Sequence, residues 1–129
     1  MTMKKRILVL DDDTSVLEMI EEVLVYEKYE VFTASAFDSV TELIEKYNPD
    51  LILLDCLLAE KNGGEICYEI KADPKTAHIP VVLISGYPKV IMSLGGIYNA
   101  DEFLSKPFDV AELLYVVRKF LAQDRPLSA

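Results

Sequence analysis

The sequence contains no tryptophan, one histidine and two cysteines. Cys56 and Cys67 are too few for a disulfide framework and lack the spacing of a zinc site, and the lone His78 completes no metal site. No apolar stretch approaches the roughly 20 residues that span a bilayer. We therefore expect a cytoplasmic protein that is not embedded in a membrane and whose thiols are reduced.

Basic residues are also in short supply. Thirteen Lys and Arg residues stand against 22 Asp and Glu residues, which gives a net charge of −9. This surplus of negative charge argues against direct binding of nucleic acid or of an anionic membrane surface. Hydrophobic residues, in contrast, make up 51% of the 129 positions, enough for a globular domain with a real core. We expect a single domain over residues 1–129, with residues 123–129 as a short C-terminal tail.

Five short apolar runs are spaced along the chain. Four of them are apolar at successive positions, which is typical of parallel strands buried on both faces of a sheet, and the fifth, EFLS, is weaker. The predicted strands are residues 7–10, 31–34, 51–54, 80–84 and 102–105. Segments with helical periodicity separate them, around residues 16–24, 40–47, 66–70 and 110–121. The alternation predicts an α/β domain with helices on both faces of a parallel sheet.

Helix starts are marked less evenly than the strands. At the first helix, Ser15 and Glu18 have the spacing of a capping box, and Asp13 is the preferred N-cap residue. Another helix, the fourth in chain order, can begin at Pro88, but the Gly95-Gly96 pair should end it early. We expect this fourth helix to be short or mobile.

Polar side chains follow four of the five runs directly: Asp11 to Asp13, Asp55, Ser85 and Lys106. Ligands of open parallel sheets bind beyond the carboxyl ends of the strands, so these side chains should converge at one edge. Clustered carboxylates repel unless a cation relieves them, and Mg²⁺ suits one or two carboxylates plus water. Asp55 is then a candidate nucleophile for a phosphoryl group, whose oxygens Lys106 and Ser85 could contact.

This constellation resembles the receiver domain of two-component signalling, the phospho-accepting module of response regulators such as the chemotaxis regulators. The resemblance covers about residues 5–122, and its motifs are ILVLDDD, DLILLDCLL, PVVLISG and FLSKPFD. It implies a flavodoxin-like, doubly wound fold: a five-stranded parallel sheet of order 2-1-3-4-5 with five helices. Flavodoxins and receiver proteins share this strand order.

The resemblance assigns a metal site and a phosphorylation site. It implies that Mg²⁺ is bound by Asp11, Asp12, Asp55 and the backbone carbonyl of Leu57, and that Asp55 accepts the phosphoryl group. Ser85 and Lys106 match the residues that contact this group in the family.

A conformational switch is also implied. Phe103 falls at the aromatic switch position, whose ring turns inward when Ser85 shifts towards the phosphoryl group. The bond between Lys106 and Pro107 is typically cis in such domains, and only X–Pro bonds adopt cis cheaply.

The implied activity is Mg²⁺-dependent transfer of a phosphoryl group from a phosphohistidine to Asp55 in a phosphorelay. The donor would be a histidine kinase or a histidine phosphotransfer protein. Phosphorylation would remodel the surface of the fourth helix, fifth strand and last helix, which a downstream protein or a missing output domain would read. Such a domain is not a conventional enzyme, although it catalyses its own phosphorylation and slow autodephosphorylation. A stand-alone receiver and a fragment of a longer regulator both fit the sequence.

Several positions depart from the usual pattern of the family. Ala59 stands where many receivers have proline, Asn62 where aspartate is common, and Asn99 where glycine is common. Because of these departures, the conformation of the loop after the phosphorylation site and the choice of partner do not follow from the resemblance. Leu57 and Tyr87, each two positions beyond a site residue, fall where the family tunes the lifetime of the phosphoryl bond.

A phosphohydrolase of the haloacid dehalogenase type is an alternative, with Asp11 as nucleophile and Asp13 as acid–base. That family needs a further strand with an acidic pair after its lysine, and here only a helix follows. It also leaves Asp55 without a role, so replacing Asp55 with Asn separates the two readings. A third possibility, a pseudo-receiver that binds without being phosphorylated, requires the loss of a key group, and none is lost.

Overall fold

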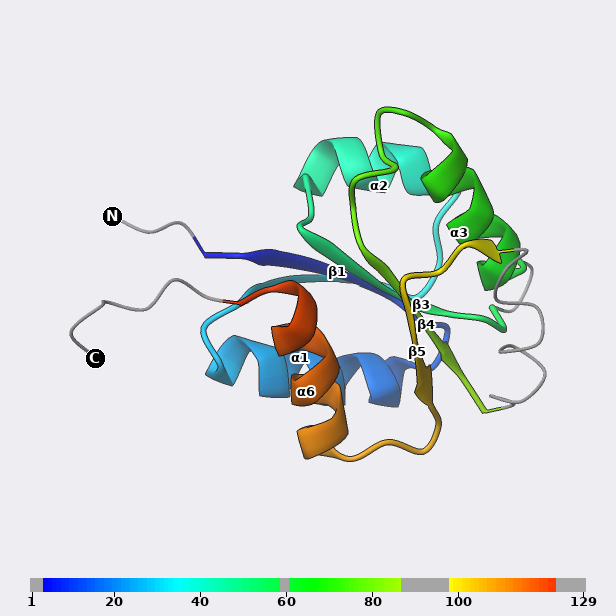
Figure 1. Cartoon of the computed structure of the whole chain (residues 1–129). Coiled ribbons are helices and arrows are strands. Elements are labelled where there is room, and N and C mark those ends of the chain that lie inside the picture. Colours follow the sequence, from blue (N-terminus) through cyan, green and yellow to red (C-terminus); the bar gives the residue numbers. More distant parts are fainter. Residues whose placement is uncertain (1–3, 59–60, 87–97, 123–129) are drawn as a thin grey trace.

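The computed structural model describes residues 4–58, 61–86 and 98–122. Within these ranges five strands and four helices follow one another along the chain (Figure 1). They are β1 (Arg6–Leu10), α1 (Thr14–Tyr26), β2 (Glu30–Ala34), α2 (Val40–Tyr47), β3 (Leu51–Asp55), α3 (Gly63–Ala72), β4 (Val81–Ser85), β5 (Glu102–Ser105) and α6 (Val110–Phe120). Each predicted strand is present, with its ends within one residue of the expected position.

The five strands form one parallel sheet of order β2-β1-β3-β4-β5. This confirms the predicted flavodoxin-like topology. The first strand, β1, lies inside the sheet next to one edge; the chain then forms that edge at β2 and returns past β1 to the other edge. The order places β3 between β1 and β4, so whatever follows β3 lies at the centre of the carboxyl edge.

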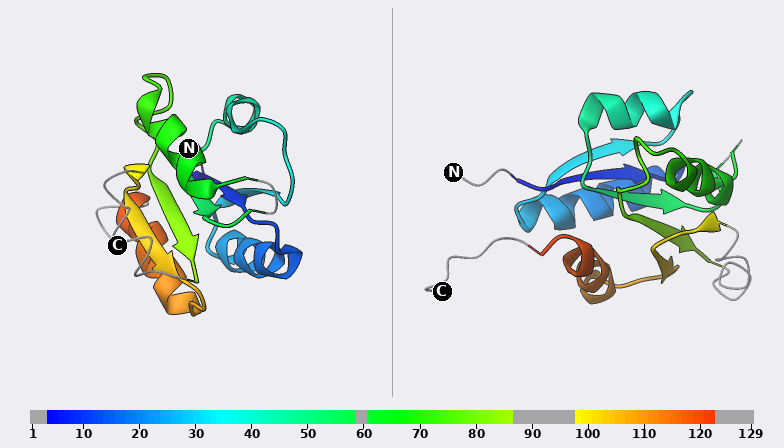
Figure 2. Two further views of the ribbon diagram at one scale, coloured as in Figure 1. Left: turned by 90° about the vertical axis from the view of Figure 1, so that its right-hand side faces the viewer. Right: turned by 45° about the horizontal axis from the view of Figure 1, so that its top comes forward.

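Both faces of the sheet are covered, which explains why its inner strands are apolar at successive positions. Along β1, Ile7 and Val9 pack into a core with α1 and α6, whereas Leu8 and Leu10 pack into a second core with α2 and α3. The same alternation continues in β3 and β4. Figures 1 and 2 show the two helix layers, α1 with α6 and α2 with α3, on opposite sides of the sheet. Successive side chains of a strand point to opposite faces, so a doubly covered strand needs apolar residues at every position.

Side-chain caps fix the helix starts. Asp13 is the N-cap of α1 and accepts hydrogen bonds from the backbone N–H groups of Ser15 and Val16. The predicted capping box of Ser15 and Glu18 is therefore wrong: Ser15 already lies inside the helix, because the aspartate two residues earlier takes the first free N–H groups. A capping box does occur at α6, between Asp109 and Glu112.

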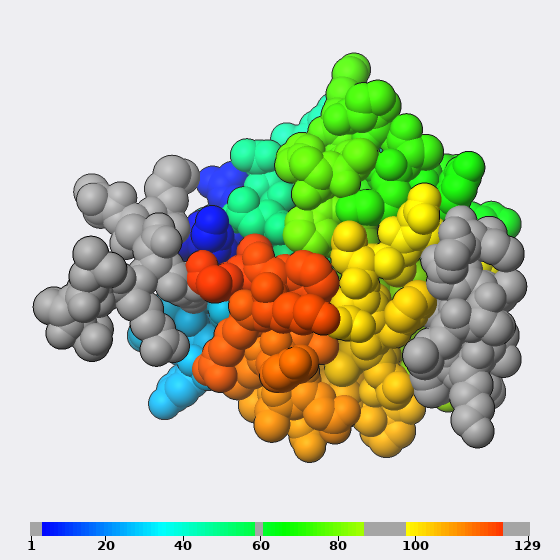
Figure 3. Space-filling model, in the orientation of Figure 1, coloured from blue at the N-terminus to red at the C-terminus, as the bar shows by residue number. Residues whose placement is uncertain are grey.

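The predicted helix from Pro88 lies outside the described residues. Just after that segment, Asn99 has a φ of 58°. This is the left-handed region, which asparagine tolerates better than most residues with a Cβ, so the departure from glycine is compatible with the backbone. Figure 3 shows α6, in orange and red, beside the yellow strand β5 on the surface. Within the described ranges, every helix is too short or too polar to cross a lipid bilayer.

Candidate functional site

The carboxyl ends of four strands bring the predicted polar residues together. Asp11 directly follows β1, Asp55 and Ser85 end β3 and β4, and Lys106 directly follows β5. Asp11 and Asp55 come from neighbouring strands, whose register pairs Leu10 with Leu54. The buried residues of the strands therefore carry the polar groups to a common edge without any help from the loops.

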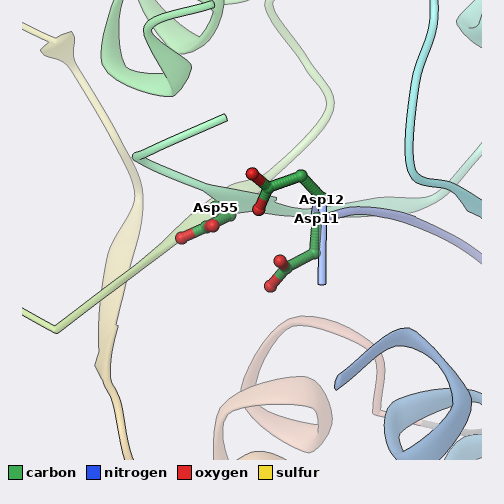
Figure 4. Close-up of side chains that lie close together, drawn as sticks. All are labelled: Asp11, Asp12 and Asp55. Carbon is green, nitrogen blue, oxygen red and sulfur yellow. The ribbon is translucent and has the colours of Figure 1, made fainter. Parts of the chain in front are cut away.

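Three carboxylates gather at this edge: those of Asp11, Asp12 and Asp55 (Figure 4). One oxygen atom from each carboxylate lies within 4.8 Å of the other two. Asp11 is fully buried and Asp55 is 5% exposed, whereas Asp12 is exposed. Buried carboxylates at this spacing repel strongly in a medium of low polarity, so the arrangement needs positive charge nearby.

Lys106 supplies one positive charge. Its Nζ lies 2.9 Å from Oδ2 of Asp11 and 3.4 Å from Oδ2 of Asp55. Burial alone would lower the pKa of Lys106, but the hydrogen bond to Asp11 and the charges of both carboxylates outweigh it and raise the pKa. The lysine backbone is anchored as well, because its N–H donates to the carbonyl of Ser85 at 2.8 Å. The Lys106–Pro107 peptide bond is cis.

The pKa of the Asp55 carboxyl group is raised even though Lys106 lies beside it. Burial and then the negative charge of Asp11 raise its pKa to about 6. Lys106 and a hydrogen bond from the backbone N–H of Leu57 act in the opposite direction. Repulsion and desolvation therefore dominate, and one positive charge does not neutralise the cluster.

The carboxylates of Asp11 and Asp13 have different hydrogen-bond partners. The Oδ1 atom of Asp11 accepts the backbone N–H of Asp13 at 2.9 Å, and its Oδ2 atom is paired with Lys106. The carboxylate of Asp13 caps α1. Because the carboxylate of Asp13 is committed to capping α1, the geometry does not favour a hydrolase with Asp11 as nucleophile and Asp13 as acid–base.

Ser85 and Phe103 lie on the adjoining strands β4 and β5. Ser85 is buried and pairs in the sheet with Ser105, while Phe103 is half-buried and packs against the core beneath α2 and α3. The predicted switch residues thus lie two residues apart in strand register, on the side of Asp55 away from Asp11.

The turn after β3 is built around two residues to which the sequence assigned no role. Gly63 packs so closely on Asp55 that a Cβ would overlap the aspartate's carbonyl oxygen, and its N–H donates to the carbonyl of Cys56 at 2.9 Å. Lys61 donates from its side chain to the backbone carbonyl of Asp38 at 2.9 Å. The contact of Gly63 lies within the turn, whereas that of Lys61 joins it to a distant segment of the chain.

The departures from the family pattern in this turn have different outcomes. Asn62 is the N-cap of α3 and accepts hydrogen bonds from the N–H groups of Gly64 and Glu65, which an aspartate would do equally well. The side chain of Leu57 is 63% exposed. Ala59 and Tyr87 lie outside the described residues.

The donor set fits a small, hard cation. Carboxylate and carbonyl oxygens are the protein ligands that Mg²⁺ prefers, usually one or two carboxylates with water completing the shell. Asp11, Asp12 and Asp55 offer such oxygens at one edge, with Asp12 facing solvent. Three carboxylates against the one ammonium group of Lys106 leave a formal surplus of two negative charges, which a divalent ion would balance.

Comparison with known proteins agrees with this geometry. The family model described as the response regulator receiver domain matches residues 7–118. The response regulator PleD of Caulobacter vibrioides is 38% identical over 117 residues, covering 90% of this chain and 26% of PleD. The DNA-binding dual master transcriptional regulator RpaA of Synechocystis is 34% identical over 117 residues, covering 90% of this chain and 48% of RpaA.

A solved structure supports the same relationship in three dimensions. The receiver domain of NtrX from Brucella abortus superposes with a TM-score of 0.79 at 30% identity, covering 92% of this chain and 99% of that one. In sequence, the chain spans about half the length of RpaA and about a quarter of PleD. What those longer proteins do as a whole therefore involves more than the part matched here.

Proposed function

This chain belongs to the response regulator receiver domain family, and on that premise we propose that Asp55 accepts a phosphoryl group from a phosphohistidine in an Mg²⁺-dependent reaction. The observation that carries the proposal is the position of Asp55. It is buried at the end of the central strand, with a second carboxylate on one side and a lysine within 3.4 Å. A carboxylate held in this way is a covalent acceptor whose surroundings can neutralise a transferred phosphoryl group.

In the proposed reaction an oxygen of Asp55 attacks phosphorus as the bond between phosphorus and the donor's imidazole nitrogen breaks, and the electron pair leaves with that nitrogen. Lys106, already between Asp11 and Asp55, pairs with an oxygen of the transferred group. The hydroxyl of Ser85 donates to another oxygen. Burial of Asp55 and Ser85 keeps the interacting groups close and poorly screened by solvent.

We assign the metal site to Asp11, Asp12, Asp55 and the backbone carbonyl of Leu57. Mg²⁺ bound there would neutralise the carboxylates and the charge that develops on the phosphoryl oxygens. Asp11 is pre-oriented for this role, because the N–H of Asp13 holds one of its oxygens.

We further propose that phosphorylation is read through Ser85 and Phe103. A shift of Ser85 towards the phosphoryl group would let the Phe103 ring turn inward, because the two lie on paired strands. This would alter the surface around β5 and α6, where the downstream partner or an output domain would bind. The donor would be a histidine kinase or a histidine phosphotransfer protein.

We also propose the extent of the domain and its own catalytic contribution. Residues 1–129 form one receiver domain with its core at about 5–122, whose own groups catalyse phosphorylation and slow autodephosphorylation. A cytoplasmic location suits it, since Cys56 and Cys67 are free thiols.

The test is incubation of the protein with Mg²⁺ and a small phosphodonor such as acetyl phosphate, followed by intact mass measurement. The wild type is expected to gain one phosphoryl group with Mg²⁺ and none with a chelator. Asp55→Asn should gain none, whereas Asp38→Asn, which removes an exposed carboxylate, should behave as wild type. An unmodified wild type, or an equal gain on Asp55→Asn, would refute the assignment.

A further inference from the structure

We infer that Lys61 is a positioning residue for the phosphorylation site: its side chain ties the turn after β3 to the segment before α2, and this holds Leu57 beside Asp55. The inference rests on the proposed function of Asp55. The hydrogen bonds and the ring contact of Lys61 lead to Asp38, Leu58 and Phe37 rather than to the carboxylate cluster, so its influence passes through the backbone.

The side chain of Lys61 has two contacts with a fixed anchor. Its Nζ donates to the carbonyl of Asp38 at 2.9 Å and lies 4.6 Å from the centre of the Phe37 ring. Phe37 packs against the core between the sheet and the helices α2 and α3, and Ser39, two residues further on, caps α2. An ammonium group held by a carbonyl and by an aromatic face is restrained at two points.

The backbone of Lys61 passes this restraint to Leu57. Lys61 and Leu58 exchange two backbone hydrogen bonds, of 3.3 and 3.2 Å, and Leu57 forms an antiparallel bridge with Asn62. The turn is therefore a narrow, closed ladder, and fixing one side at Lys61 fixes the other side at Leu57.

Leu57 cannot hold this position through its own side chain, which is 63% exposed. Its backbone is what matters to the site. The N–H of Leu57 hydrogen-bonds to the carboxylate of Asp55, and its carbonyl is a proposed metal ligand. A displacement of the turn would move both groups away from the phospho-accepting carboxylate, and small misplacements of this kind reduce reaction rates strongly.

Lys61 lies outside the hydrophobic core, so its effect on the site can be measured without disrupting the fold. A groove of about 420 Å³ lies beside it, lined in part by Asp38, Asn62 and Glu65. Shortening or neutralising the side chain therefore opens no cavity in the core, and the thermal midpoint of the metal-free protein should fall by only about 3–5 °C, as expected for the loss of one hydrogen bond.

The experiment compares Lys61→Met and Lys61→Arg with Lys46→Met, a control that removes an exposed lysine lying 5.2 Å from the Tyr47 ring at the far end of α2. Amide hydrogen exchange of Leu57 is followed by NMR in the metal-free protein. Lys61→Met should speed this exchange roughly threefold to tenfold, the factor expected for loss of one ordinary hydrogen bond. Lys61→Arg, which can donate to the same carbonyl and stay over the same ring, and Lys46→Met should leave it within about twofold.

Phosphorylation by acetyl phosphate is the second measurement, and its initial rate should fall severalfold in Lys61→Met and recover in Lys61→Arg. Exchange of Leu57 that is unchanged in Lys61→Met would overturn the inference. So would a general loss of protection across β3 and α3, since that would make Lys61 a structural residue only. If the exchange pattern is as expected but no variant, wild type included, gains a phosphoryl group, the positioning role stands and the proposed function fails.

Discussion

Replacing Asp55 with Asn should stabilise the metal-free protein, although it removes the proposed phosphorylation site. Burial and the charge of Asp11 raise the pKa of Asp55 from 3.8 to about 6, a difference of about 2 pKa units. Each unit corresponds to about 1.36 kcal/mol, so ionising this carboxyl group costs the folded state about 3 kcal/mol relative to the unfolded state. Asparagine is nearly the same size and carries no charge, and it should recover about 2–3 kcal/mol, or roughly 8 °C in the thermal midpoint.

The stabilisation by Asp55→Asn should depend on pH, because the raised pKa of Asp55 makes the stability of the wild type depend on pH. Between pH 3.8 and 6 the folded protein holds a proton on Asp55 that the unfolded chain has released, so this group makes stability fall as the pH rises through that window. The destabilisation is complete above pH 6 and absent below the unfolded value. The advantage of Asp55→Asn should therefore be full at pH 7 and should vanish near pH 4.

The assay is thermal and urea unfolding of both proteins in a chelator, at pH 7 and at pH 4, with Asp38→Asn as the control for loss of an exposed carboxylate. Asp38→Asn should change stability by less than about 0.5 kcal/mol. Adding Mg²⁺ at pH 7 should raise the midpoint of the wild type more than that of Asp55→Asn. The reasoning is refuted if Asp55→Asn is no more stable than the wild type in the chelator, or if its advantage is the same at both pH values.

Three other outcomes follow from the same geometry. Lys106→Met removes the partner of the buried carboxylate of Asp11 and should destabilise the metal-free protein by about 2 kcal/mol in urea unfolding; an unchanged midpoint would mean that the pair contributes nothing. Gly63→Ala places a Cβ against the carbonyl oxygen of Asp55 and should cost about 3 kcal/mol and slow phosphorylation, and wild-type behaviour would show that the turn yields freely. Burial raises the pKa of Cys67 to about 12, so its thiol should resist iodoacetamide in the folded protein at pH 8 and react only on unfolding. Folding stability should also decline above about pH 9, where the thiol of the unfolded chain ionises. Rapid labelling of the native protein would contradict the burial of Cys67.

The sequence was most informative where burial alone decides structure. The runs at 7–10 and 51–54 are apolar at every position because helices cover both faces of the sheet, and this made the strands and their parallel arrangement predictable. The polar residue that ends or follows each run then lies at the carboxyl edge by necessity. Asp11, Asp55, Ser85 and Lys106 were found in this way, and the family resemblance supplied the strand order.

Sequence reasoning was weaker where one segment meets another across a loop. The reach of Lys61 to Asp38 depends on how two loops fold over the sheet, and the close approach of Gly63 to Asp55 depends on the path of the turn after β3; no spacing in the sequence reports either distance. The capping box expected at Ser15 failed for a simpler reason. Two candidate caps stood close together, and the aspartate that came first in the chain took the free N–H groups.

Hydrophobic burial of the strands β1 and β3 keeps the carboxylates of Asp11 and Asp55 close together. The cost of holding Asp55 ionised beside Asp11 is about 3 kcal/mol, from a pKa raised to about 6. All the side chains from Ile7 to Leu10 and from Leu51 to Leu54 are fully buried, and each contributes about 1.5–3 kcal/mol of gross hydrophobic stabilisation. Two such side chains are enough to offset this cost of desolvation and repulsion, so the fold can keep a charge cluster that would disperse in an unfolded chain. It follows that substitutions in β1 and β3 should weaken the fold and the site together, whereas neutralising Asp55 should strengthen the fold while disabling the site.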